Sequence, residues 1–292
     1  MGFCSSGFFI ALHDIAIVFE IGIIVCMDGI IDFHTHAFPD AIAARAMQSL
    51  QHGCDVKAQL DGKISSLLAS MDSCGVEKSV ICSIATKPSQ FEPILKWSEQ
   101  IRTERIVPFP SVHPDDEHCL ERICLIKKSG FKGVKMHPFY QDFFLDEPKM
   151  LPIYEKICDE NLLLMMHTGF DIAFGRIRRC DPAKILYVVE KFPTLKFIST
   201  HLGSWQDWQQ VQQLLVGKPI YMELSMSLEY LEPEVARNMI LAHPPEYVLF
   251  GTDSPWTSQP NTLELLQQLE LGDKLENLIC RQNAARLLNE QG

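Results

Sequence analysis

Two histidines stand one residue apart in the stretch IDFHTHAFPD, where an apolar run ends before Pro39. Side chains two residues apart on a strand point to the same face, so His34 and His36 can reach one ion while Thr35 faces the opposite side. Zinc binds imidazole nitrogen at about 2.1 Å, and neutral imidazoles also suit iron, manganese and nickel. The pair therefore predicts a metal chelate.

Further side chains able to bind a metal follow other apolar runs. They are His137 in FKGVKMHP, His167 in LLLMMHTG, His201 in LKFISTHLG and Asp253 in EYVLFGTDSP. A lone histidine at a strand end is more often a satisfied polar residue, but the coincidence of several favours chemistry. A carboxylate such as Asp253 adds negative charge and leaves a coordination position open for water.

Regular elements must bring these residues together. Short runs rich in Val, Ile and Phe alternate with helical patterns, which is typical of a parallel sheet with crossover helices. One helix is predicted over 61–75, with Gly75 as its stop, and another over 181–193, with Asp181 at the cap and Pro182 behind it. The eight runs are GIIDFHTH, KSVICSIA, RIVPFPSVHP, FKGVKMHP, LLLMMHTG, LKFISTHLG, PIYMELSM and EYVLFGTDSP.

Eight parallel strands with eight crossover helices close most naturally into a (β/α)8 or TIM barrel, an α/β fold. An open doubly wound sheet is the competing arrangement, but no Gly-x-Gly-x-x-Gly follows the first run. In such barrels the active site lies at the carboxyl ends of the strands, where the candidate ligands fall.

Composition limits the partners. The 292 residues are 47% hydrophobic and 22% charged, which is typical of a globular chain that folds without disulfides. The net charge of −11 argues against a nucleic-acid partner and favours a small-molecule substrate. No two of the ten cysteines show the spacing of a zinc ribbon or redox motif, so we expect reduced thiols and a cytoplasmic location.

The first residues are apolar but do not read as a membrane span. The stretch FFIALHDIAIVFEIGIIVCM is interrupted by His13, Asp14 and Glu20, and no basic residues precede it. The opening MGFCSS fits a myristoylation pattern, which is a weak signal by itself. We expect residues 1–26 to be an N-terminal extension, with the true start at Met27 and one barrel domain over 27–292. No membrane partner is expected.

From about Met27 to its end the chain resembles the amidohydrolase superfamily, specifically the amidohydrolase-2 branch of metal-dependent hydrolases and nonoxidative decarboxylases. The resemblance rests on DFHTHAFP, GVKMHP, MMHTG, THLGSW, FGTDSPW and NAARLL, in that order. It implies that His34, His36 and His167 are metal ligands and that Asp253 is both ligand and proton shuttle. His201 would hydrogen-bond the reacting water or substrate, or ligate a second ion.

Other residues are candidates for substrate contact. The resemblance places Lys135 where two-metal relatives keep a carboxylated lysine; the alternative is an ordinary amine that fixes a substrate carboxylate. His137 shares a side with Lys135, but Pro138 after it also suits a strand end. Arg176, with Arg178 and Arg179, is a candidate carboxylate clamp. Trp205, with Trp208 and Trp256, is a candidate pocket wall. GVKMHP lacks the glutamate of related metal-dependent deoxyribonucleases, which argues against nuclease activity.

The predicted reaction is hydrolysis of a small ester, lactone or amide. One divalent ion per chain, most simply Zn²⁺, would lower the pKa of its water to about 7, with Asp253 carrying the proton and His201 stabilising charge. Decarboxylation of a small carboxylated or aromatic substrate is the alternative. A barrel without catalysis, acting as a binding or scaffold protein, is a remote third, and a homodimer is left open.

Overall fold

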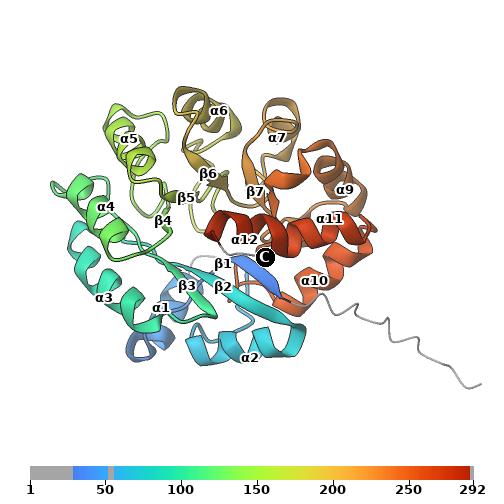
Figure 1. The fold of residues 1–292 in the computed structure, drawn as a ribbon, viewed down its shortest axis with the longest axis horizontal. Coiled ribbons are helices and arrows are strands. Elements are labelled where there is room, and N and C mark those ends of the chain that lie inside the picture. Colours follow the sequence, from blue (N-terminus) through green and yellow to red (C-terminus); the bar gives the residue numbers. More distant parts are fainter. Residues whose placement is uncertain (1–28, 52–55, 290–292) are drawn as a thin grey trace, which may run out of the picture.

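The computed structural model describes residues 29–51 and 56–289, in which parallel strands alternate with helices (Figure 1). The predicted extension 1–26 and the start at Met27 lie outside the described residues. The strands among the described residues are β1 (Ile30–Thr35), β2 (Val76–Cys82), β3 (Ile106–Phe109), β4 (Gly133–Met136), β5 (Leu163–Met166), β6 (Lys196–Ser199), β7 (Tyr221–Glu223) and β8 (Val248–Leu249). Seven of them lie within the predicted runs, and β2 begins at Val76, two residues before the run KSVICSIA.

The helices surround the strands. They are α1 (Asp40–Gln51), α2 (Ile64–Cys74), α3 (Phe91–Ile101), α4 (Cys119–Lys128), α5 (Leu151–Asp159), α6 (Pro182–Lys191), α7 (Trp208–Leu214), α8 (Ser227–Tyr230), α9 (Pro233–Ala242), α10 (Gln259–Gln268), α11 (Asp273–Asn277) and α12 (Asn283–Leu288). No helix in the described part of the chain is long and apolar enough to cross a bilayer.

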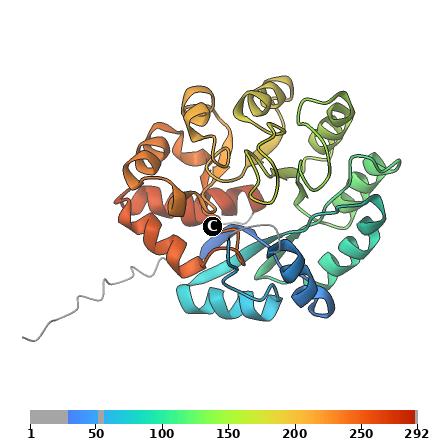
Figure 2. The same ribbon diagram turned by 180° about the vertical axis from the view of Figure 1, so that it is seen from behind.

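The strands close into a barrel, as predicted. Parallel pairing runs through β1-β2-β3 and through β4-β5-β6-β7-β8. The first gap is bridged where Lys135 N donates to Pro110 O at 2.9 Å, and the second where Phe33 N donates to Phe250 O at 2.9 Å. The helices form an outer ring in both views (Figures 1 and 2). This is one (β/α)8 barrel domain.

Alternation along the strands fills two layers of core. On β5, Leu163 and Met165 pack inside the barrel, while Leu164 and Met166 pack between the strands and the helices. Leu287 of α12 joins the inner cluster, and α12 lies across one end of the barrel (Figure 1). Polar groups occupy the opposite end of the barrel, at the carboxyl ends of the strands.

Two predicted details differ from the structure. The sequence predicts one helix after each strand, yet α1 and α2 both follow β1, α8 and α9 both follow β7, and α11 and α12 extend the chain after α10. Of these helices, α1 lines the mouth and α12 closes the base. Asp181 does precede α6, but its carboxylate accepts from Lys184 Nζ at 2.7 Å and does not cap the helix N–H groups. Gly75 ends α2 as predicted, with φ +74°.

Candidate active site

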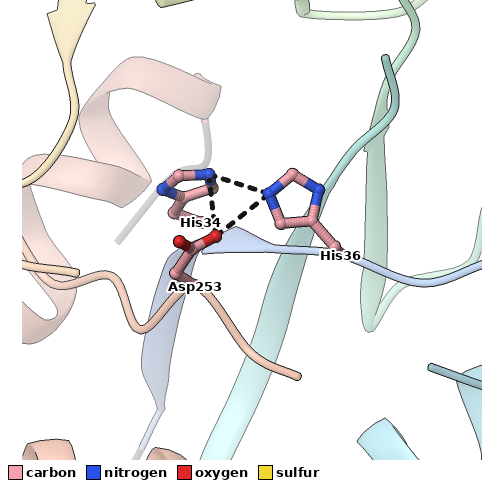
Figure 3. Close-up of side chains that lie close together, drawn as sticks. All are labelled: His34, His36 and Asp253. Atoms are coloured by element: carbon pink, nitrogen blue, oxygen red, sulfur yellow. Dashed lines mark hydrogen bonds and ion pairs between the residues drawn. The ribbon is translucent and has the colours of Figure 1, made fainter. Parts of the chain in front are cut away.

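One cluster joins the end of β1 to the loop after β8. His34 Nε2 lies 3.1 Å from His36 Nε2, and Asp253 Oδ1 lies 3.4 Å from the first nitrogen and 3.0 Å from the second (Figure 3). Asp253 N donates to His34 O at 2.7 Å, which holds the two segments together. The two histidines therefore share a side, as the spacing predicts.

The far nitrogens of both imidazoles are held by oxygen acceptors. His34 Nδ1 lies 3.0 Å from Glu223 Oε1, and His36 Nδ1 lies 2.6 Å from Cys82 O. A carboxylate and a carbonyl only accept, so each Nδ1 carries the hydrogen and each Nε2 presents a lone pair. Both lone pairs point toward Asp253 Oδ1.

A second histidine pair is oriented in the same way. His167 Nε2 donates to Phe170 O at 3.0 Å, and His201 Nδ1 lies 3.2 Å from Ser225 O. The remaining nitrogens, His167 Nδ1 and His201 Nε2, face one another at 3.2 Å. Neither carries a hydrogen in these tautomers, so this pair too presents lone pairs inward.

These facing lone pairs fit a metal ion. Burial lowers the pKa of both His34 and His167 well below the ordinary value, which disfavours a proton between the nitrogens. His34, His36 and Asp253 offer ligand atoms within 4.8 Å of one another. A cation among lone pairs and a carboxylate oxygen removes their mutual repulsion, so this donor set is suited to a divalent ion.

The predicted ligand His167 falls into a different group. Its ligand atom clusters within 4.8 Å with those of His137 and Asp171, apart from the His34, His36 and Asp253 cluster. The rings of His137 and His167 stack at 4.0 Å between centroids, and His137 Nε2 lies 3.3 Å from Asp171 Oδ2. His137 Nδ1 is buried without a hydrogen-bond partner. Asp171 lies in the loop after β5 and is not indicated by the sequence patterns.

Lys135 lies between the groups. Its side chain is buried on β4, and Nζ lies 3.0 Å from His34 Nε2. The amine therefore donates to one of the nitrogens that a metal would use. This position is compatible with either predicted role, the amine that meets a substrate or the bridge between two ions.

Glu223 is a second functional residue that the sequence patterns do not indicate. It is fully buried at the end of β7, and its carboxylate meets His34 Nδ1 as well as the backbone N–H groups of His201 at 2.9 Å and Ser225 at 2.7 Å. Carboxylates behind metal-binding histidines fix the tautomer and raise ligand basicity. The available signal was an acid inside the apolar run PIYMELSM.

Two site residues occupy the left-handed backbone region. His201 has φ +59° and Asp253 has φ +65°, conformations that cost roughly 1 kcal/mol or more for residues other than glycine. The contacts from His201 N to Glu223 and from Asp253 N to His34 O offset this cost. The strain aims both side chains into the barrel mouth.

A cavity of about 400 Å³ opens over the clusters. The ligand candidates, Lys135, His137 and Trp205 all line it, and so does Trp256. Trp208 is absent from the lining, and its indole N–H donates to His201 O at 2.9 Å.

Arg176 lies elsewhere than expected. It is exposed, its guanidinium stacks 3.9 Å from the Phe170 ring centre, and it donates to Gln206 Oε1 at 2.8 Å. Arg178 pairs with Asp207 and Arg179 with Asp142. No arginine is found among the described residues that line the cavity, because these three side chains bind to residues of neighbouring loops outside it.

Comparison with known proteins agrees with this geometry. The sequence model of the amidohydrolase family, in its amidohydrolase-2 branch, matches residues 31–289. The match includes both ligand groups and all eight strands except Ile30, the first residue of β1. No curated protein matches the sequence.

Solved structures share the fold. An uncharacterised TIM-barrel protein from Bordetella bronchiseptica matches with TM-score 0.72 and 19% identity, over 89% of this chain and 98% of that one. A 5-carboxyvanillate decarboxylase from Novosphingobium aromaticivorans, complexed with manganese, matches with TM-score 0.66 and 13% identity, over 91% and 97%. A probable 2-pyrone-4,6-dicarboxylic acid hydrolase from Acinetobacter baumannii matches with TM-score 0.62 and 14% identity, over 89% and 99%. At these identities the likeness shows the fold alone.

Proposed function

Because the chain belongs to the amidohydrolase family, a family of metal-dependent hydrolases and decarboxylases, we propose that it hydrolyses a small ester, lactone or amide. The observation that carries this proposal is the convergence of imidazole lone pairs on Asp253 Oδ1 at 3.0 and 3.4 Å. A divalent ion held there supplies Lewis-acid chemistry, which acidifies water and polarises a carbonyl.

The residues of the chain have distinct parts in this reaction. Asp253 takes the proton of the attacking water and returns it to the leaving group. Lys135 donates a hydrogen bond to the substrate from the side of β4. His201, in the tautomer set by Ser225, presents Nε2 as an acceptor, whereas its predicted role of stabilising negative charge requires a donor. It therefore orients water or ligates a second ion more readily than it donates to an oxyanion.

Decarboxylation is the second candidate, and Lys135 favours it. Among the described residues that line the cavity, Lys135 alone is a lysine or arginine, so the site offers one amine to one substrate carboxylate. The manganese-bound decarboxylase with the same fold shows that such barrels carry this chemistry in another protein. Asp253 would then deliver a proton to the carbon that loses CO₂.

We propose one tightly held ion per chain, Zn²⁺ in the first instance, with His34, His36, His167 and Asp253 as ligands and an uncarboxylated Lys135. The imidazole-rich donor set supports zinc, although manganese suits related sites. His167 must then turn from His201 toward the His34 cluster. The cytoplasmic location and the homodimer remain proposals, and the scaffold alternative predicts a purified protein that neither retains a metal nor is activated by one.

A paired assay tests the reaction. Metal-loaded protein is screened against lactones, amides and aromatic carboxylates, with proton release and CO₂ evolution followed together. Proton release without CO₂ from a lactone, ester or amide supports the proposal. CO₂ evolution from an aromatic carboxylate would replace it with the decarboxylase reading. The His34→Ala, His36→Ala double variant is the control for activity that does not depend on the site.

A further inference from the structure

The cavity reaches well beyond the metal-binding groups, and this part of it has its own composition. Its wall is formed by α1 and α3, which lie side by side (Figures 1 and 2). The side chains that line it there are apolar, and we call them the apolar arm: Ile42 and Ala46 from α1, Ile94 and Trp97 from α3, and Ile84 between β2 and α3.

The charged residues of the same two helices are excluded from the arm. Arg45 on α1 and Lys96 on α3 are exposed and do not line the cavity. Ser83, Thr86 and Gln90 are the polar residues close to it in sequence that do line the cavity, and all three are uncharged. A charged substrate group in this arm would lose hydration without gaining an ionic partner, which is strongly unfavourable.

Opposite the arm, the cavity keeps its polar groups at the floor. Lys135, Asp253 and the histidines gather at the strand ends, and Arg176 lies outside the lining. The site is therefore divided into a polar floor that meets the reacting group and an uncharged wall that meets the rest of the molecule. Pockets of this kind fix orientation with few polar groups and gain affinity from apolar burial.

We propose that the substrate carries an uncharged aliphatic or aryl group, which the apolar arm binds while the reacting carbonyl or carboxyl lies on the polar floor. This inference rests on the proposed metal-dependent function. It selects apolar esters, lactones, amides or monocarboxylates over dicarboxylated compounds, because a second carboxylate would lie against Ile94 and Trp97.

Alkyl hydroxamates test the arm separately from the reaction. Their head group chelates a divalent ion whether the enzyme is a hydrolase or a decarboxylase, and only their tails differ. Calorimetry on the metal-loaded protein should show affinity rising about fourfold per added methylene until the arm is filled. A hydroxamate whose tail has the same length but ends in a carboxylate should bind no better than the methyl hydroxamate, whose tail is a single methyl group.

Matched variants locate the effect. Ala46→Phe fills the arm and should abolish the gain with tail length while the methyl hydroxamate still binds. Ala44→Phe is on the solvent side of α1, where Ala44 is exposed and does not line the cavity, so it should leave the series unchanged. Ile94→Lys should bind the carboxylate-ended hydroxamate more tightly than the wild type does. This variant provides a second test if Ala46→Phe fails to fold.

The outcomes separate the two claims. If no hydroxamate binds the metal-loaded wild type, the metal-dependent function itself fails. If the methyl compound binds but affinity is flat along the series, or if Ala44→Phe and Ala46→Phe act alike, the apolar arm is not the binding site and the function stands.

Discussion

Glu223 links the two histidine groups through a single buried carboxylate. It accepts from His34 Nδ1 and from His201 N, and Ser225 Oγ donates to it at 2.7 Å. The same oxygen atoms therefore set the tautomer of one predicted ligand and the backbone position of another predicted site residue. Glu223 is a positioning residue for the metal centre.

Replacing Glu223 with Gln should weaken metal binding by roughly 10- to 100-fold, because the neutral amide lacks the negative charge that raises the basicity of His34. Metal affinity is measured by competition with a chelator, and circular dichroism checks that the fold persists. Glu234→Gln on the exposed part of α9 is the control. An unchanged affinity would show that Glu223 has only a structural part.

Lys135→Ala should leave the metal in place and weaken substrate binding by roughly tenfold, because a charged hydrogen bond is lost. The variant is compared with Lys132→Ala, whose side chain is exposed on the same segment. Loss of metal from Lys135→Ala, two equivalents of metal in the wild type or activation by bicarbonate would instead show that Lys135 bridges two ions.

The individual residues were predictable from the sequence to different degrees. His34 and His36 share a side because spacing on a strand is local information. Glu223 was missed because its partner His34 lies 189 residues before it, and Asp171 was missed because it lies in the loop after β5, where no strand pattern marks it. Arg176 was misplaced because the sequence does not show that Phe170 and Gln206 hold it outside the cavity.

At the scale of elements, Asp32 fastens β1 to the segment after β8. Its carboxylate accepts from Thr252 N at 3.0 Å, from Thr252 Oγ1 at 2.6 Å and from Gln259 Nε2 at 2.8 Å. Asp32 lies two residues before His34, and Thr252 directly precedes Asp253. The closure of the barrel and the alignment of the metal ligands therefore depend on the same residue.

Asp32→Ala should lower the free energy of unfolding by about 3 kcal/mol, since it leaves buried donors of Thr252 and Gln259 without an acceptor. Urea unfolding measures the change. Asp146→Ala, at an exposed aspartate, is the control and should stay within about 0.5 kcal/mol of the wild type. If Asp32→Ala lowers the free energy of unfolding by no more than the control does, Asp32 does not hold β1 to the segment after β8.

The side chains of β1 do not follow the strict alternation that the sequence pattern predicts. Strict alternation would place Phe33 opposite to His34, yet Phe33 packs inside the barrel and His34 also lines the cavity. The pairing register with β2 shifts between Asp32 and Thr35, which reverses the alternation at that point. Such an irregularity depends on neighbouring strands, so the apolar run predicts the strand and not its bend.

At the scale of the whole molecule, the order of eight strands was predictable because each apolar run is local and each is followed by a helical pattern. Closure of the barrel followed from their number and parallel direction. The helices α1, α8, α11 and α12 were not separated from their neighbours in the sequence pattern. For α1, which lines the mouth, and α12, which closes the base, the reason is that their placement depends on tertiary contacts.

A chain that starts at Met27 should fold and bind metal as the full chain does, because all strands and ligand candidates described here lie after it. Thermal unfolding and elemental analysis of both chains check this. Aggregation or metal loss confined to the shorter chain would show that residues 1–26 are needed by the barrel.

The most direct test of the metal centre is the metal content of purified wild type and of the His34→Ala, His36→Ala double variant, measured by elemental analysis. The wild type should retain one equivalent per chain, and the double variant should lose most of it together with activity, because two of the inward lone pairs are removed. His118→Ala, at an exposed histidine, should keep the wild-type content. Full occupancy in the double variant would contradict the assignment of this cluster as the metal site.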